Sequence, residues 1–345
     1  MRDNEPHSSR FLPVLDRRQR ELRDLRISVT DRCNFRCTYC MPREHYGPNF
    51  KFLPRAEILS YEEIARLSRV FASLGVRKLR LTGGEPLLRA DVPELVRMLS
   101  AIPEVEIALT TNGSLLAEKA GALFAAGLRR VTVSLDSIED SVFRRMSDVQ
   151  FPVARVLEGI EAAAQAGLRP IKINAVIQRG VNDDGIVALA RHFKGSGHIL
   201  RFIEFMDVGT TNGWRLDRVV SGREIEERIA RELPLEPIPS RYASDVARRF
   251  RYTDGSGEIG IITSVSEPFC GDCSRGRLSS DGKFYTCLFA VRGADLRAPL
   301  RAGASDDELR ALVQQIWEGR EDRYSELRTK SSALVPRVEM SYIGG

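Results

Sequence analysis

Short apolar runs rich in β-branched residues alternate with longer amphipathic segments between residues 25 and about 206. The short runs are typical of buried strands and predict β-strands at Leu25–Thr30, Lys78–Thr82, Glu106–Thr110, Arg130–Ser134, Ile171–Val176 and Leu200–Met206. The longer segments repeat with the period of a helix and predict helices at Tyr61–Leu74, Val92–Leu99, Leu115–Ala126, Val153–Ala166 and Asp184–His192. Gly75, Gly127 and Gly167 follow three of these helices, where C-terminal caps belong.

Six strands joined by helices predict an α/β fold with a parallel sheet and right-handed crossovers. We expect residues 24–206 to form a curved, partial (βα)6 barrel, with a doubly wound sheet as the alternative. Beyond residue 207 the sequence predicts a helix at Ser221–Glu232, hairpins at Asp254-Gly255 and Asp281-Gly282, and a helix near Asp306–Trp317. We interpret residues 207–345 as a smaller α+β region closing over the barrel, and residues 1–23 as a mobile basic arm.

The composition is that of an ordinary globular protein, with 345 residues, 43% apolar and 29% charged. No apolar run is long enough to cross a bilayer and no signal peptide is evident, so we expect a cytoplasmic protein without a membrane partner. The net charge of +5 does not call for nucleic acid as a partner. Seven of the 52 basic residues are lysines and the rest are arginines, which suits an anionic substrate.

All six cysteines fall into two groups of three, and the first is Cys33, Cys37 and Cys40. A reducing compartment argues against disulfides, so three thiolates at this C-x3-C-x2-C spacing indicate a soft metal or a cluster. A structural zinc needs four ligands, and the nearest histidine, His45, is a poor candidate. A four-iron cluster held by three cysteines keeps one iron open for a small molecule.

The second group is Cys270, Cys273 and Cys287, in a C-x2-C-x13-C pattern. The hairpin expected at Asp281-Gly282 would fold the third cysteine back toward the other two. A zinc ribbon needs a fourth ligand near Cys287, and none is there. A second four-iron cluster with an open iron is therefore favoured, with zinc as the alternative.

The segment from Arg26 to Pro42, which carries the first three cysteines, resembles the radical S-adenosylmethionine (SAM) superfamily. The segment from Thr82 to Pro86 (Thr-Gly-Gly-Glu-Pro) is similar to the part of that superfamily that holds the SAM amino group, although Gly83-Gly84 alone also fits an ordinary turn. The resemblance implies a barrel of the radical SAM type. It also implies that the open iron binds SAM, which one electron then cleaves to methionine and a 5′-deoxyadenosyl radical.

The second cysteine group, with arginines two and four residues after Cys273, resembles the GTP 3′,8-cyclase family of molybdenum cofactor biosynthesis. The likeness spans about residues 24–345 and includes the segments Arg201–Gly209 and Met340–Gly345. It implies two [4Fe-4S] clusters, SAM as cofactor and GTP as substrate. The implied product is (8S)-3′,8-cyclo-7,8-dihydroguanosine 5′-triphosphate, formed when the ribose 3′ hydrogen is removed and C3′ adds to C8 of the guanine.

This resemblance assigns roles to residues that composition alone would place on the surface, in turns or in the core. The implied cluster ligands are Cys33, Cys37, Cys40, Cys270, Cys273 and Cys287. The implied SAM contacts are Tyr39, Gly84, Ser134 and Met206. The implied GTP contacts are Arg26, Arg80, Thr110, Lys172, Arg275 and Arg277, with the open iron of the second cluster facing the guanine.

Three glycine patterns need separate interpretation. The terminal Gly344-Gly345 fits a frayed tail or a ubiquitin-like tail, but the resemblance implies a tail that reaches into the active site as part of the catalytic machinery. Gly276 stands where the family commonly carries a bulkier residue, so we expect a looser pocket there. The G-x-G-x-x-G pattern at 255–260 precedes a strand rather than a helix, so it predicts a hairpin turn and not a dinucleotide site.

Rival functions are a peptide-modifying radical SAM enzyme with an auxiliary cluster, an electron-transfer protein, and a zinc-bearing nucleic-acid binder. The peptide-modifying enzymes commonly carry more cysteines and give the arginine pair 275/277 no role. An electron carrier does not need the Gly-Gly-Glu-Pro segment. The family resemblance further implies a homodimer and transient contacts with an electron donor and the next enzyme of the pathway.

Overall fold

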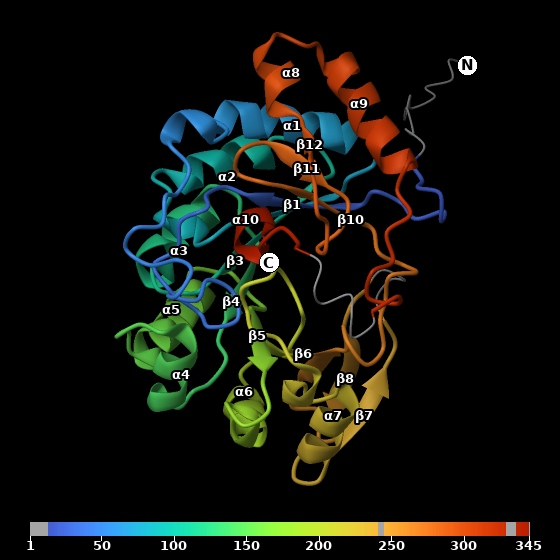
Figure 1. Cartoon of the computed structure of the whole chain (residues 1–345). Coiled ribbons are helices and arrows are strands. Elements are labelled where there is room, and N and C mark those ends of the chain that lie inside the picture. The colour runs from blue at the N-terminus through green and yellow to red at the C-terminus, as the bar shows by residue number, and fades with distance from the viewer. Residues whose placement is uncertain (1–12, 241–244, 329–335, 345) are drawn as a thin grey trace, which may run out of the picture.

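A computed structural model of the chain describes residues 13–240, 245–328 and 336–344 (Figure 1). Its central strands are β1 (Asp24–Ser28), β2 (Lys78–Thr82), β3 (Glu106–Thr111), β4 (Arg130–Ser134), β5 (Lys172–Ile177) and β6 (Ile199–Glu204). They pair in parallel and in sequence order, which confirms the predicted strands and the parallel sheet. A doubly wound sheet would reverse its strand order at a switch point, so this order excludes that alternative.

Five helices confirm the sequence prediction: α1 (Tyr61–Ser73), α2 (Val92–Ser100), α3 (Leu116–Ala125), α5 (Val153–Gln165) and α6 (Ile186–Phe193). The glycines at 75, 127 and 167 have positive φ angles of 105°, 107° and 99°, as the predicted helix caps require. Figure 1 shows these helices around the outside of the curved sheet. None of the helices in the described ranges is both long and apolar enough to span a bilayer.

The short α4 (Asp140–Ser147) was not predicted, because it is polar and buries only a few side chains. Three single 3-10 turns of the described residues also lie outside the prediction: η1 (Arg55–Glu57), η2 (Pro86–Leu88) and η4 (Leu216–Arg218). A further turn, η3 (Asp183–Gly185), forms the start of the helix predicted at Asp184–His192. The remaining helices are α7 (Gly222–Ala230), α8 (Arg297–Arg301), α9 (Asp306–Glu318) and α10 (Met340–Ile343). Of these, α7 and α9 were predicted.

The region after residue 206 lengthens the same sheet at both edges instead of only closing over it. At one edge, β9 (Glu258–Ile262) pairs in parallel with β6 and continues into antiparallel β8 (Arg248–Tyr252) and β7 (Leu235–Ile238). At the other, β10 (Arg275–Leu278) pairs in parallel with β1 and continues into β11 (Lys283–Tyr285) and β12 (Ala294–Asp295). The hairpins predicted at Asp254-Gly255 and Asp281-Gly282 are confirmed as the β8–β9 and β10–β11 turns.

The prediction of a mobile arm over residues 1–23 is wrong for residues 13–23. Val14 and Leu22 are buried in the hydrophobic core, and so are the charged Asp16 and Arg20. Arg23 and Asp24 donate their backbone N–H groups to the carbonyl of Ser274, which fixes this segment beside β10. Residues 1–12 lie outside the described residues.

Gly276 does not leave the gap in the pocket that its sequence position suggested. It lies in β10 between Arg275 and Arg277, and alternation along a strand turns it to the opposite face. A Cβ atom added there would lie 2.7 Å from Cε2 of Phe284 and 3.1 Å from Cδ1 of Leu22. The position therefore faces filled core, and the expectation of a looser pocket is wrong.

We predict that Gly276→Ala lowers the free energy of unfolding by about 1–3 kcal/mol, because the new methyl group overpacks the buried Phe284 ring. Urea unfolding of the metal-free chain measures this change. Gly121→Ala in α3 is the matched control, since its added Cβ meets no atom within 4 Å apart from its chain neighbours and the backbone of its own helix. A Gly276→Ala protein as stable as the unchanged chain would contradict this packing.

Candidate active site

A single cavity of about 320 Å³ lies on the inner face of the central strands and the loops that follow them. All six cysteines line it, together with Tyr39, Gly84, Ser134, Met206, Arg26, Arg80, Thr110, Lys172, Arg275 and Arg277. The structure therefore brings together every sequence-predicted site residue except the two terminal glycines. Loops at the carboxyl ends of parallel strands are where barrel proteins build their sites.

The first cysteine group occupies the loop after β1. Cys33 accepts hydrogen bonds on Sγ from the backbone N–H of Phe35 (3.4 Å) and from Nδ2 of Asn112 (3.9 Å). Burial raises the pKa of the Cys33 thiol to about 11 and also raises the pKa of Cys37 and of Cys40. Buried thiolates next to one another need a cation, and an iron–sulfur cluster supplies one.

The backbone of the first cysteine loop leaves no room for a side chain at either of the two glycines before Glu85. The backbone N–H of Gly84 donates to the carbonyl of Thr30 (2.8 Å), and a Cβ at Gly84 would collide with the carbonyl of Arg32. The buried Glu85 carboxylate then accepts from the N–H of Asn112 and from Oγ1 of Thr111, both at 2.7 Å. Burial raises the pKa of Glu85 to about 7. This segment thus clamps the first cysteine loop to the end of β3.

Asp136 is a site residue that sequence reasoning missed. Its Oδ2 accepts a 2.7 Å hydrogen bond from the hydroxyl of Tyr39, and its Oδ1 accepts from the N–H of Val176 (2.8 Å). Burial raises the pKa of Asp136 to about 6 and also raises the pKa of Tyr39. The one feature of the sequence that indicates Asp136 is its position, two residues after the end of β4 and close to the predicted site residue Ser134.

The second cysteine group lies against arginine side chains. Arg275 donates from Nη2 to Sγ of Cys273 (3.3 Å), and the N–H of Phe289 donates to Sγ of Cys287 (3.4 Å). Burial raises the pKa of the Cys287 thiol to about 12. Burial also raises the pKa of Cys273, but the charges of Arg275 and Arg320 outweigh it and bring that pKa to about 6.

Both groups fit iron–sulfur clusters by their donor chemistry: three partly buried thiols each, with N–H donors aimed at sulfur. No three His, Cys, Asp or Glu side chains in the described part of the chain are arranged around a single metal ion. The cysteines of a four-iron cluster bind different irons, so they do not have to converge on one point.

The two cysteine groups lie at opposite ends of one pair of parallel strands. Asp24 of β1 is beside Arg275 of β10, and Ile27 is beside Leu278. Cys33 follows β1, whereas Cys273 precedes β10. At about 3.3 Å per residue, this register separates the groups by about 15–20 Å.

Cationic side chains fill the space between the cysteine groups. Arg26 lies between Arg80 on β2 and Arg277 on β10 in the sheet register. Burial, followed by repulsion from Arg277 and Arg80, lowers the pKa of Arg26. Burial and neighbouring cations likewise lower the pKa of Lys172 to about 7. Such a concentration of buried positive charge fits a polyanionic ligand.

Three further cations of this cavity, Lys78, Arg201 and Arg320, were missed from the sequence. Lys78 is two residues before Arg80 on β2 and therefore shares its face of the sheet. Arg201 donates from Nε to Oδ1 of Asn174 (3.0 Å) on the neighbouring strand. Arg80 donates to the hydroxyls of Thr110 (3.1 Å) and Thr132 (3.2 Å).

The C-terminal segment enters the site. Arg277 donates from Nη1 to the carbonyls of Gly344 and Ile343, and Gly344 has a φ of +78° that favours glycine. A Cβ at Gly344 would collide with Cγ2 of Thr82, so this position has no room for a side chain. The short helix α10, which precedes Gly344, contacts β1 and is drawn near the middle of the molecule in Figure 1. The frayed-tail alternative is wrong for Gly344, while Gly345 lies outside the described residues.

Comparison with known proteins adds independent information. Residues 27–193 match the Radical SAM superfamily, and residues 198–326 match the family described as Molybdenum Cofactor Synthesis C. A GTP 3′,8-cyclase from Acidothermus cellulolyticus is 55% identical, with 96% of this chain and 99% of that protein covered. Those from Xanthomonas axonopodis pv. citri and Staphylococcus epidermidis are 52% and 48% identical over the same shares.

Among solved structures, Streptococcus suis SuiB bound to S-adenosylmethionine is similar with a TM-score of 0.61. The likeness covers 91% of this chain and 70% of SuiB at 15% identity, so it shows a shared fold only.

We predict that inorganic tripolyphosphate binds this cavity with proton uptake at pH 8. Lys172, with a pKa of about 7, is mostly neutral at that pH, and an anion beside it favours its charged form. Affinity should therefore fall as the pH rises from 6.5 to 8.5. Calorimetry in buffers of different ionisation enthalpy measures the uptake. Lys172→Met should reduce the proton uptake and Lys51→Met, at an exposed site, should not; equal uptake in both variants would contradict the assignment.

Proposed function

Because the chain belongs to the GTP 3′,8-cyclase family of the radical SAM superfamily, we propose that it converts GTP into (8S)-3′,8-cyclo-7,8-dihydroguanosine 5′-triphosphate, in the first step of molybdenum cofactor biosynthesis. The observation that carries this proposal is the strand register. It places two three-cysteine groups at opposite ends of one cavity, with the cationic side chains between them.

The first cysteine group and the loops around it would hold a [4Fe-4S] cluster and SAM. When bound, these cofactors supply a 5′-deoxyadenosyl radical that removes a hydrogen atom from substrate. Tyr39, Gly84, Ser134 and Met206 line the same end of the cavity and would contact SAM. Asp136 fixes the Tyr39 hydroxyl, so it positions that contact.

The cationic side chains would bind and orient GTP. Arg26, Arg80 and Lys172, supported by Thr110, Lys78 and Arg201, offer charge-assisted hydrogen bonds to a triphosphate. Cys270, Cys273 and Cys287 would hold the second [4Fe-4S] cluster, whose remaining iron offers a ligand position to the guanine. Holding the nucleotide at both ends would present the ribose C3′–H to the SAM side of the cavity.

The tail at Gly344 would complete the site and exclude water. Its carbonyl accepts from Arg277, which joins the terminal segment to the cationic wall. Arg337 donates to the carbonyl of Asp207 (2.6 Å), and Glu339 accepts from Thr210 (2.9 Å), so the tail is also tied to the loop after Met206. We propose that Gly344 acts in catalysis through this placement, and that Gly345, which lies outside the described residues, acts with it.

The rival peptide-modifying function is not favoured, because the cyclase relatives match over almost the full length of both chains. We further propose a homodimer that works in the cytoplasm and meets an electron donor transiently. All six cysteines are free thiols, as in proteins of a reducing compartment.

We predict that GTP deuterated at C3′ transfers its deuterium to 5′-deoxyadenosine. The assay uses anaerobically reconstituted protein, SAM and a strong reductant, with mass analysis of the 5′-deoxyadenosine. Cys37→Ala should abolish SAM cleavage altogether, since it removes a ligand of the first cluster. Unlabelled 5′-deoxyadenosine with intact GTP would reject GTP as the substrate, and cleavage by Cys37→Ala would reject the cluster assignment.

We predict that Arg277→Ala lowers kcat/KM for GTP by about 10- to 100-fold, which corresponds to losing one or two charge-assisted hydrogen bonds. SAM cleavage uncoupled from GTP should persist, because Arg277 lies away from the first cysteine group. Arg292→Ala, at an exposed arginine, is the control and should be unchanged. An unaltered kcat/KM in Arg277→Ala would remove this residue from the site.

A further inference from the structure

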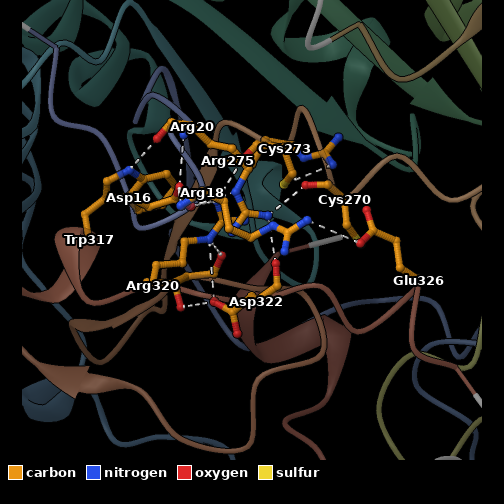
Figure 2. A network of polar contacts seen from close by, with 11 residues as sticks. Asp16, Arg18, Arg20, Cys270, Cys273, Arg275, Trp317, Arg320, Asp322 and Glu326 are labelled. Carbon is orange, nitrogen blue, oxygen red and sulfur yellow. Dashed lines mark hydrogen bonds and ion pairs between the residues drawn. The ribbon is translucent and has the colours of Figure 1, made fainter.

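The second cysteine group rests on a buried ionic cluster formed by Asp16, Arg20 and Arg320. All three side chains are at most 4% exposed. Oδ2 of Asp16 accepts from Nε of Arg20 (2.7 Å) and from Nη1 of Arg320 (2.9 Å) (Figure 2). One carboxylate thus accepts from two guanidinium groups. Asp322 supplies a second carboxylate, whose Oδ2 lies 3.5 Å from Nε of Arg320, so the network pairs two buried arginines with two acidic side chains.

The two arginines use their other donors on the backbone that carries the cysteines. Arg20 donates from Nη1 to the carbonyl of Cys270 (2.7 Å). Arg320 donates from Nη1 to the carbonyl of Cys273 (2.8 Å) and from Nε to the carbonyl of Thr286 (3.0 Å), the residue before Cys287. The two arginines therefore bind the backbone at each of the three cysteines. They bind the residue's own carbonyl at Cys270 and Cys273, and the preceding carbonyl at Cys287.

These hydrogen bonds to the backbone matter because the three cysteines lie outside helices and strands. Cys270 and Cys273 are in the loop between β9 and β10, and Cys287 follows the end of β11. No helix or strand hydrogen bonds set the spacing of the three sulfur atoms. A metal site needs its ligands held to within about 0.5 Å, and outer residues normally provide that support.

We propose that Asp16, Arg20 and Arg320 are positioning residues for the second cluster: they set the spacing of its three cysteines and place positive charge beside it. The N-terminal segment is then a working part of the second metal centre. This inference rests on the proposed function, which assigns a cluster to these cysteines. The Arg320 guanidinium, whose charge Asp322 offsets in part, favours the reduced, more negative form of the cluster and raises its reduction potential.

The same residues also help the fold, so a purely structural role must be separated. Nε1 of Trp317 donates to the carbonyl of Arg20 (3.0 Å), and the guanidinium of Arg320 lies 4.5 Å from the centre of the Trp317 ring. A role in stability alone would lower the free energy of unfolding without changing the spectrum or the potential of a cluster that still binds.

The test compares Arg320→Gln and Arg320→Lys with Arg17→Gln. Arg17 is the matched control, because it is a nearby arginine whose ion pair with Glu321 is exposed on both sides. The full chain is reconstituted anaerobically, and iron and sulfide are counted per chain. A second set of variants also carries Cys33, Cys37 and Cys40 as alanines, so that electron paramagnetic resonance and redox titration report on the second cluster alone.

We expect Arg320→Gln to reduce the iron content from about eight toward about four atoms per chain, while SAM cleavage at the first cluster persists. Arg320→Lys keeps the charge but cannot reach both carbonyls. It should retain the cluster with an altered resonance spectrum. Arg17→Gln should match the unchanged chain in every measurement.

The inference is overturned if both Arg320 variants hold about eight irons with an unchanged spectrum and potential. If Arg320→Gln does not fold, Arg320→Lys alone tests the inference. An unchanged spectrum and reduction potential of the second cluster in Arg320→Lys also overturn the inference. Failure of the second-cluster assignment, the part of the proposed function on which the inference rests, has a different signature: the unchanged chain would bind about four irons and show no second-cluster signal.

Discussion

Like charges side by side on neighbouring strands are the constraint on which this structure depends. Arg26 faces Arg80 on one side and Arg277 on the other, and all three are partly or fully buried. Such an arrangement destabilises a sheet unless a counter-charge occupies the space between the strands. The three arginines therefore lower the stability of the fold at this place, and the binding of a polyanion, such as the proposed GTP, would restore part of that stability.

The need to place Arg277 beside Arg26 explains the topology of the C-terminal region. Arg277 lies about 250 residues after Arg26 in the chain, and its strand β10 pairs with β1. The strand β10 therefore joins the sheet of the barrel and does not form a separate sheet. Parallel pairing then puts Cys273 at the opposite end of the strand pair from Cys33. One pairing thus determines both the cationic wall and the separation of the two metal centres.

The regular elements could be predicted because their period is local. The strands β1 to β6 and five of the helices follow from periodicity alone, whereas the polar α4 does not. Long-range pairings leave no local trace, so the edge position of β10 and the role of Lys78 were not foreseen. Asp16 and Arg20 resemble a solvated arm in sequence, because Arg320, the partner that allows their burial, is 300 residues away. The SAM and GTP contacts came from family resemblance and not from patterns of single residues.

Both ends of the described chain meet at the cavity, and this couples the site to the completion of folding. Residues 16–20 reach the second cysteine group, while residues 337–344 reach Arg277 and the loop after β6. Contacts between such distant segments form only after the intervening sheet is in place, because closing long loops costs chain entropy before the contact repays it. A cluster bound by Cys270, Cys273 and Cys287 would therefore select the fully folded chain, and its binding free energy would add to the stability of the terminal segments. The second metal centre and the two terminal segments thus stabilise one another, which explains why a buried, charged network is retained at a position where hydrophobic packing alone would be more stable.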